Sequence, residues 1–469
     1  MNEKSVAKAS FGSVEASDAE RGRQSERQAR ALAQRGQLER FAQTPCPLGL
    51  SSTVYSVLWP AAQEVIEKAF REDAPALLAA HQHPWLKTQD GAEKSFFDAW
   101  LRFASPALVG GKERFRLNFI HAYPTAGSSE AIRESIHQLA CATPRGVVVV
   151  FNGEYEGYEA LAVADGLAVL KLDRARWREE LSALSNRLGT RPARFYLSQP
   201  SSIDGEAWTD FAAFLDAICE QLGAQMPVAL DLAYVGASAR LRPVAASHPA
   251  IQQVFFSLSK PFGVYYRRIG GVFSREAIPS LAGNQWFKNL DSLALGEKLL
   301  RAQAEPFALA RGAGAAQTLA VSWISDALAG ALETMGAEIA AASVPLLATL
   351  RPLKAADLDQ WEIWAKQGAA AGLPGQLAKM ARRGAEGRPA ASWRLCLAPL
   401  ISELLAEAGA GAASWLRDPQ QLGLGQSWPI SDAPGRAKEL CAPTDPRIQW
   451  GLDGIDEDVM RPPRLAQDA

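Results

Sequence analysis

Short apolar runs alternate with helix-forming stretches between about residues 115 and 275, and this alternation limits the possible folds more than any other feature. The runs lie at Val147–Phe151, Leu167–Leu172, Phe195–Ser198, Val228–Leu230 and Val254–Ser257. Helical stretches, including Glu130–Ala140 and Trp208–Leu222, separate most of them. Runs that are apolar throughout are typical of strands buried on both faces. Their alternation with helices predicts an α/β domain with a mostly parallel sheet.

The length of the chain predicts two packed domains, because 469 residues exceed what one small core organises. We expect a polar, partly helical N-terminal extension over residues 1–45, a large domain over 46–311, a smaller domain over 312–441 and a proline-containing tail over 442–469. One long helix over 286–311 would join the two domains. The arginine-rich extension favours a solvated or partner-packed helix over an anion-binding arm.

Charge and cysteine content exclude several classes of protein. The net charge of −2 comes from 49 basic and 51 acidic residues, so no overall field attracts nucleic acid or an anionic membrane. The five cysteines form no CxxC pair, which indicates reduced thiols and a cytoplasmic protein. No apolar run approaches the roughly 20 residues that span a bilayer, and the charged N-terminus has no signal peptide. His81 and His83 have no acidic or thiol neighbour in sequence, so we expect no metal site.

A lysine follows the last apolar run, within the string Val254–Gly270 (VFFSLSKPFGVYYRRIG). Lys260 comes just after the strand, at the edge where open α/β sheets build their sites. Desolvation there lowers the pKa of a lysine and makes its amine a nucleophile for Schiff-base formation. Arg268, eight residues further on, can pair with a phosphate near that lysine. A lone lysine here would be interpreted as an ordinary loop residue, but the full string is more specific and indicates a nucleophilic lysine near an anion.

The same string resembles the cofactor-lysine signature of the class I/II aminotransferases, which are fold-type I enzymes dependent on pyridoxal 5′-phosphate (PLP). Ser257, Lys260, Arg268 and Gly270 match its Ser-x-x-Lys pattern followed by Arg and then Gly. The resemblance implies a large domain with a mostly parallel sheet, a smaller C-terminal α+β domain, and a homodimer with active sites at the subunit interface. It also implies that Lys260 forms the internal aldimine, while Ser257 and Arg268 hold the cofactor phosphate.

A glycine- and serine-rich turn opens a helix at Gly127, Ser128 and Ser129. Free N–H groups and the helix dipole make such a turn an anion site, although an ordinary helix cap would use the same residues. The segment resembles the family's phosphate cup, which implies that these three residues wrap the PLP phosphate.

Two further segments concern the cofactor ring. Asp231 ends an apolar strand, and a buried carboxylate is costly unless it meets a cation such as a protonated pyridine nitrogen; a helix-capping aspartate is the alternative. Asp231-Leu-Ala-Tyr234 resembles the family's Asp-x-x-Tyr, which implies that Asp231 binds the pyridine nitrogen and Tyr234 the phenolic oxygen. Tyr155, with Tyr158 as second candidate, resembles the aromatic residue stacked on the ring, although loop aromatics also serve simple packing.

Arg394 and Gln199 complete the predicted site. Arg394 lies in an apolar, strand-like run and needs an anion there. In the family a similar C-terminal arginine binds the α-carboxylate of the substrate, and the resemblance implies that role for Arg394. Gln199 stands where the family carries the Asn of Asn-Pro-x-Gly, and here the glycine, Gly205, comes late. A longer side chain at that position changes the hydrogen bonds that tune the cofactor.

The resemblance implies a PLP-dependent aminotransferase that acts on a small-molecule amino acid, with Lys260 as the base on the α-proton. The alternative is a PLP enzyme of specialised metabolism that catalyses elimination, replacement, cyclisation or oxidation of an amino acid. A DNA-binding regulator would need a recognisable helix-turn-helix domain, for which the first 50 or so residues are short. A catalytically inactive scaffold would be expected to lose Lys260 or Asp231, and both are present.

Overall fold

The chain divides into two compact units, Met1–Cys46 and Pro47–Ala469, and every residue described below lies in the second. The predictions on the N-terminal extension, on His81 and His83, and on the C-terminal tail lie outside the described residues. The structure is a computed structural model and describes residues 56–73, 86–143, 145–223, 226–238, 242–283, 289–303, 307–327, 332–333, 336–353, 376–377, 393–398, 401–402 and 405.

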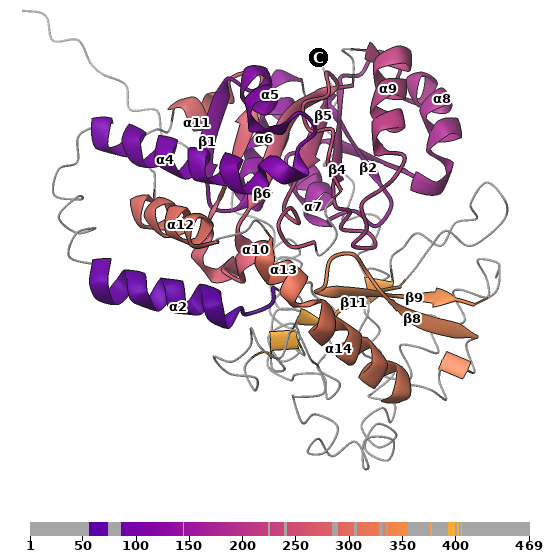
Figure 1. The fold of residues 1–469 in the computed structure, drawn as a ribbon. Coiled ribbons are helices and arrows are strands. Elements are labelled where there is room, and N and C mark those ends of the chain that lie inside the picture. Colours follow the sequence, from indigo (N-terminus) through magenta and orange to yellow (C-terminus); the bar gives the residue numbers. More distant parts are fainter. Residues whose placement is uncertain are drawn as a thin grey trace, which may run out of the picture. The chain divides into compact units, whose positions relative to one another are not determined.

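The main sheet has seven strands in the order β1-β7-β6-β5-β4-β2-β3 (Figure 1). Strand β7 is antiparallel to its neighbours β1 and β6, and the pairings from β6 to β3 are all parallel. The predicted α/β fold is confirmed, and the five apolar runs are β2 to β6. The strands are β1 (His121–Thr125), β2 (Val147–Phe151), β3 (Ala168–Leu172), β4 (Ala193–Ser198), β5 (Val228–Asp231), β6 (Ile251–Ser257) and β7 (Gly270–Ser274).

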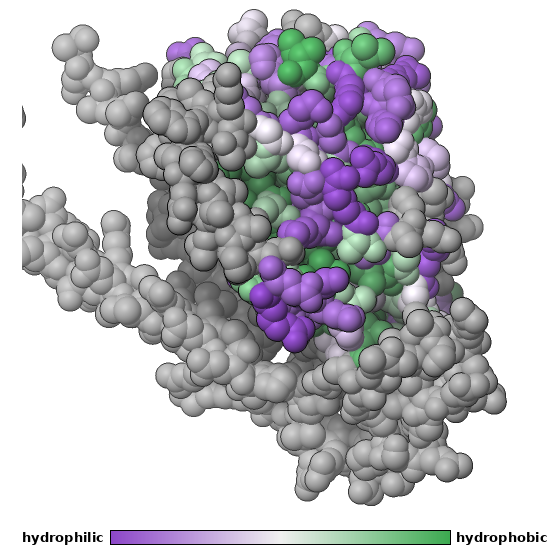
Figure 2. All heavy atoms as spheres, turned by 60° about the vertical axis from the view of Figure 1, so that its left-hand side comes forward, coloured by the Kyte–Doolittle hydropathy of each residue, from purple (hydrophilic) through white to green (hydrophobic). Residues whose placement is uncertain are grey.

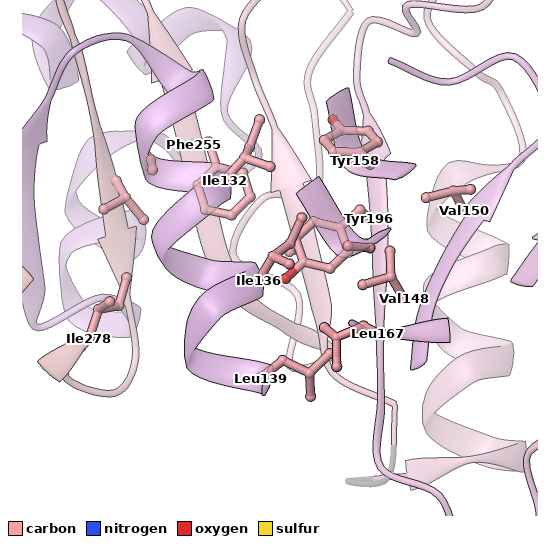
Figure 3. Packing of buried hydrophobic residues seen from close by; sticks show 14 residues of the cluster. Ile132, Ile136, Leu139, Val148, Val150, Tyr158, Leu167, Tyr196, Phe255 and Ile278 are labelled. Atoms are coloured by element: carbon pink, nitrogen blue, oxygen red, sulfur yellow. The ribbon is translucent and has the colours of Figure 1, made fainter. Parts of the chain in front are cut away.

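One face of the sheet is covered by α6 (Ser128–Ala142) and α7 (Gly157–Ala164). Ile132 and Ile136 of α6 lie toward Tyr196 of the sheet, and Val148 belongs to the same buried cluster (Figure 3). Because α-helical side chains three and four apart share a face, the apolar positions of α6 form one stripe against the strands. This packing sets where the first turn of α6 lies at the edge of the sheet.

The opposite face packs against α4 (Leu86–Ala104) and α9 (Phe211–Gln221), and α8 (Trp177–Leu188) packs against α9. The ring of Phe195 on β4 lies 5.1 Å from that of Phe214 on α9, and Trp100 on α4 stacks on Phe256 of β6 at 4.3 Å. Successive strand residues point to opposite faces, which is why Phe195 faces α9 while the next residue, Tyr196, faces α6. The central strands β2, β4, β5 and β6 are therefore buried on both sides, as their apolar runs predict, whereas the edge strand β3 is largely exposed or half-buried.

A second, smaller sheet is antiparallel, in the order β10-β11-β9-β8. Helix α14 (Gly314–Ala327) packs against β8. These elements fall within the predicted smaller domain. Its strands are β8 (Ala337–Ala341), β9 (Leu347–Pro352), β10 (Gln376–Leu377) and β11 (Trp393–Cys396).

The single helix predicted over 286–311 is wrong, because the structure has two helices there. Helix α12 (Leu290–Ala302) ends at an extended Gln303, and α13 (Ala308–Gly312) begins after Phe307, whose φ of +66° is left-handed. The intervening sequence contains Pro306, which lacks the N–H that a continuous helix requires. Apolar periodicity alone did not reveal this interruption.

The remaining elements are short or lie outside the two sheets. Among the described residues visible in Figure 2, hydrophilic side chains predominate, with smaller hydrophobic areas between them. No helix within the described part of the chain is long and apolar enough to cross a membrane. The further elements are α2 (Pro60–Lys68), η1 (Ala69–Asp73), η2 (Ser105–Ala107), α5 (Gly111–Asn118), η3 (Arg174–Arg176), α10 (Ser259–Phe262), η5 (Tyr265–Arg267) and α11 (Pro279–Gly283).

Candidate active site

The carboxyl ends of β5 and β6 bring the predicted carboxylate and lysine to one edge of the sheet. The two strands are parallel neighbours, with Asp231 at the end of β5 paired to Phe255 of β6. Lys260 follows in α10, a single turn of helix directly after β6. Parallel strands present their carboxyl ends at the same edge, where sites form in sheets of this kind.

Burial dominates the chemistry of the Lys260 amine. Loss of solvation lowers the pKa of Lys260 to about 8; the charge of Arg394 acts in the same direction, while Cys396 and Asp231 oppose it. With that pKa, about a tenth of the amine is neutral at pH 7. Lys260 is thus a usable nucleophile and base near neutral pH.

Asp231 is buried and held by two hydrogen bonds. Its Oδ1 accepts from the backbone N–H of Ala233 at 2.9 Å, and its Oδ2 accepts from the hydroxyl of Tyr158 at 3.3 Å. Burial raises the pKa of Asp231 to about 7; the bond from Ala233 opposes the shift and the nearby Glu154 adds to it. A cation placed against this carboxylate would offset the cost of burying its charge.

The predicted aromatic residues differ in exposure. Tyr234 is buried, and burial raises the pKa of its hydroxyl; the charge of Arg394 opposes that shift. Tyr158 is fully buried, whereas Tyr155 is half-buried. Their rings pack edge to face, with the ring centroids 5.5 Å apart. Tyr155 is therefore the more accessible of the two, and its stacking role stays a prediction.

The predicted phosphate cup lies at the first turn of α6. Gly127 precedes this 15-residue helix with a φ of +77°, a conformation that favours glycine. A Cβ on Gly127 would lie 2.9 Å from Nη2 of Arg268 and 3.5 Å from Oγ of Ser257. Ser128 and Ser129 supply the first N–H groups of the helix. A glycine, a helix start, an arginine and a hydroxyl thus converge, which suits an anion.

Arg268 and Ser257 are both held in place by the backbone around them. Arg268 adopts a left-handed φ of +52° and donates from Nη2 to the carbonyl of Ala126 at 2.8 Å. Ser257 donates from Oγ to Oγ of Ser259 at 3.0 Å and accepts from the N–H of Ser259 at 3.1 Å. The Arg268 bond ties the segment after α10 to the turn before α6, and the Ser257 bonds join the end of β6 to the start of α10.

Arg394 comes from the second sheet. It lies on β11, opposite Thr349 of β9, is buried, and donates from Nη1 to the carbonyl of Ser202. Its charge acts on the pKa values of both Lys260 and Tyr234. The fold therefore brings Arg394, more than 130 residues away in sequence, to the lysine.

Gln199 is engaged by the backbone. Its Nε2 donates to the carbonyl of Trp208 at 3.2 Å, and its Oε1 accepts from the N–H of Trp208 at 3.1 Å. Both ends of the amide are used in closing this loop. A contact between Gln199 and the cofactor stays a prediction, and it would have to compete with these two bonds.

Glu154 is a buried residue of this site that sequence reasoning missed. Its carboxylate accepts from Ser198 and Ser202, and burial raises its pKa despite those bonds. The available signal was a glutamate placed three residues after the buried strand Val147–Phe151, at the edge where sites form.

Within the described residues, no group of three or more His, Cys, Asp or Glu is arranged to hold a metal ion.

Comparison with known proteins now defines the family. The model of the family described as aminotransferase class I and II matches residues 48–371. The chain belongs to this family. YbdL from Escherichia coli, reported with a methionine aminotransferase function, is 17% identical with a TM-score of 0.51, over 79% of this chain and 96% of its own. An aminotransferase from Staphylococcus aureus is 16% identical with a TM-score of 0.51, over 78% of this chain and 93% of its own. The comparison with curated proteins gave no match.

Membership in the class I and II aminotransferases makes the chain a PLP-dependent enzyme of amino-acid chemistry. The residues of the site fit PLP. Its aldehyde requires an amine such as Lys260, its pyridine nitrogen a carboxylate such as Asp231, and its phosphate an anion cradle such as the one where a Cβ on Gly127 would meet Arg268. The solved structures support the fold.

Proposed function

We propose that this enzyme is an aminotransferase, which moves the amino group of an amino acid to a 2-oxo acid. One observation carries the proposal: Lys260 directly follows β6, at the edge where Asp231 ends the neighbouring parallel strand β5. PLP, when bound, supplies an electrophilic carbonyl and an electron-withdrawing ring. The remaining chemistry is the task of the residues around it.

Five residues would bind the phosphate. The convergence of Gly127 with Arg268 and Ser257 supports this role, because charge-assisted bonds and helix N–H groups hold phosphate well. The group consists of Gly127, Ser128, Ser129, Ser257 and Arg268.

Four residues would orient the ring. Asp231 would pair with the pyridine nitrogen, since burial has already removed the carboxylate from water. Tyr234 would donate to the phenolic oxygen and Tyr155 would cover one ring face. Gln199 would adjust the same phenolic oxygen if its bonds to Trp208 open.

Lys260 and Arg394 would act on the substrate. Arg394 would bind the α-carboxylate as a fork of two N–H donors. The substrate Cα would then be held near Lys260. The neutral amine of Lys260 would take the α-proton as a general base and later donate a proton as a general acid. Family members are typically dimeric, and we extend this to a homodimer with active sites at the subunit interface.

The test is a half-reaction with purified, PLP-loaded enzyme and a panel of the twenty standard amino acids. A donor should convert the visible absorption of the lysine-bound cofactor to that of pyridoxamine phosphate, and a 2-oxo acid should restore it. Lys260→Ala should bind PLP without the lysine-bound band and should not turn over. If no donor yields pyridoxamine phosphate, the enzyme is not an aminotransferase.

A second candidate is elimination, replacement, cyclisation or oxidation of an amino acid. The engagement of Gln199 by the Trp208 backbone favours it, because the family's Asn contact to the phenolic oxygen would be lost or altered. Release of ammonia or of a side-chain fragment, with PLP regenerated and no acceptor added, would identify this chemistry.

A further inference from the structure

Glu154 is a buried carboxylate, and among the described residues its hydrogen bonds go to one turn, Ser198–Ser202. Its Oε2 accepts from the hydroxyls of Ser198 at 2.6 Å and Ser202 at 2.7 Å, and its Oε1 accepts from the N–H of Ser198 at 3.2 Å. A carboxylate is costly to bury, so three such bonds indicate that it holds a specific geometry. Glu154 thus fastens both ends of the turn.

Ser202 connects Glu154 to the second sheet. Its hydroxyl donates to Glu154, its N–H donates to Oγ of Ser198 at 2.6 Å, and its carbonyl accepts from Nη1 of Arg394. The carbonyl of a residue held at both its N–H and its side chain has little freedom to turn. The fixed direction of the Ser202 carbonyl therefore restrains the guanidinium of Arg394, which donates to it.

The same loop meets the second sheet at other points. The N–H of Val344 donates to the carbonyl of Gly205 at 3.0 Å, and the N–H of Ser343 donates to Oε1 of Glu206 at 2.8 Å. These bonds join the loop after β4 to the connection between β8 and β9. Arg394, on the strand next to β9, thus lies against a loop that Glu154 secures from the side of the large sheet.

We propose that Glu154 is a positioning residue of the substrate-carboxylate site. It holds Ser202, and through the Ser202 carbonyl it directs the guanidinium of Arg394 toward the substrate. The inference rests on the proposed function, in which Arg394 binds the α-carboxylate. Small displacements of such a binding group are costly, because a misplacement of about 1 Å can reduce a rate about 100-fold.

Two substitutions at Glu154 separate geometry from charge. Glu154→Ala removes all three acceptor interactions. In Glu154→Gln, the amide oxygen can accept from the N–H of Ser198, and the NH₂ can donate to the two hydroxyls, which rotate to accept. The glutamine variant should therefore hold the turn, while the alanine variant should not.

The measurement is the dissociation constant, from absorbance titration of PLP-loaded enzyme, for two probes. The first is whichever standard amino acid binds the wild type most tightly, and the second is its decarboxylated amine. Glu154→Ala should weaken binding of the amino acid about tenfold or more and binding of the amine by less than about twofold. In Glu154→Gln, the dissociation constants of the amino acid and of the amine should both stay within about threefold of the wild-type values.

Equal weakening of both probes in Glu154→Ala, or no weakening of either, overturns the inference. Gln253→Ala is the matched control, since Gln253 is buried and bonded to Arg194 and Gln138 in a separate network. It should lower the melting temperature and leave the ratio of the two dissociation constants unchanged.

Arg394→Gln tests the proposed role of Arg394 separately from the inference on Glu154. If Arg394→Gln leaves the preference for the amino acid over the amine intact, the proposed role of Arg394 fails, and the inference on Glu154 fails with it. If Arg394→Gln removes that preference and Glu154→Ala retains it, only the inference on Glu154 fails.

Discussion

The hydroxyl of Tyr158 donates to Oδ2 of Asp231 across 3.3 Å, and both side chains are buried. Tyr158 lies on α7, while Asp231 ends β5, so the bond joins the helix layer to the edge of the sheet where the site forms. A donor to a buried carboxylate both orients it and favours its charged form.

Tyr158→Phe should reduce the rate of the half-reaction about tenfold or more, because the lost bond to a charged group is worth on the order of 1.5–3 kcal/mol. Loss of this donor should also raise the pKa of Asp231 further. Tyr196→Phe is the control, since it removes a buried hydroxyl that bonds to Ser135 at 2.9 Å instead. Stopped-flow absorbance measures both variants, and equal rates in the two would contradict the prediction.

Gly127→Ala should raise the dissociation constant of PLP about tenfold or more. The added Cβ would lie 2.9 Å from Nη2 of Arg268, inside the anion cradle, at a φ of +77°. Gly166→Ala is a matched control for backbone strain, since its φ is +73° and a Cβ there meets nothing within 4 Å. Both variants should lose about 1 kcal/mol of stability, and only Gly127→Ala should lose cofactor in equilibrium dialysis.

The reactivity of Lys260 should follow a pKa near 8 in the cofactor-free enzyme. Acetylation by acetic anhydride, followed by mass spectrometry of the Lys260 peptide, should rise with pH, reach its midpoint near pH 8 and level off above about pH 9, because only the neutral amine reacts. Arg394→Gln should move the midpoint upward, since the positive charge of Arg394 helps to lower this pKa. A rate that still rises at pH 10 in the wild type would falsify the prediction.

Asp231 should make the cofactor-free enzyme less stable as pH rises. Its pKa is about 7 in the folded protein against an ordinary value of 3.8, so the folded state retains a proton that the unfolded state has lost in this window. The free energy of unfolding of the wild type, relative to Asp231→Asn, should fall by a few kcal/mol between about pH 4 and 7. Urea unfolding at a series of pH values measures this difference. A flat or rising difference would show that Asp231 is not destabilised by burial.

Strands β2 to β6 could be predicted from sequence because each contains a short, mostly apolar run. Strands β1 and β7 were not singled out, since His121–Thr125 contains a proline and is half-buried along most of its length, and Gly270–Ser274 begins with two glycines. Their place in the sheet comes from the pairing of β1 with β7 and of β7 with β6. Local composition does not indicate such pairings. The division of the expected long helix into α12 and α13 was missed for a different reason, since its local signal, Pro306, stands in the sequence but the prediction followed the helical composition across it.

The sequence by itself determined the family and the cofactor, because Lys260, Arg268 and Gly270 are close neighbours along the chain and their spacing is a local property. Only the tertiary structure decided which distant groups surround that lysine. Glu154, Ser202 and Arg394 are separated by 48 and 192 residues, and their contacts exist because two sheets meet at one loop. Hydrogen bonds between such distant residues form only once burial and strand order have placed them, and burial is also what shifts the pKa of Lys260 and of Asp231.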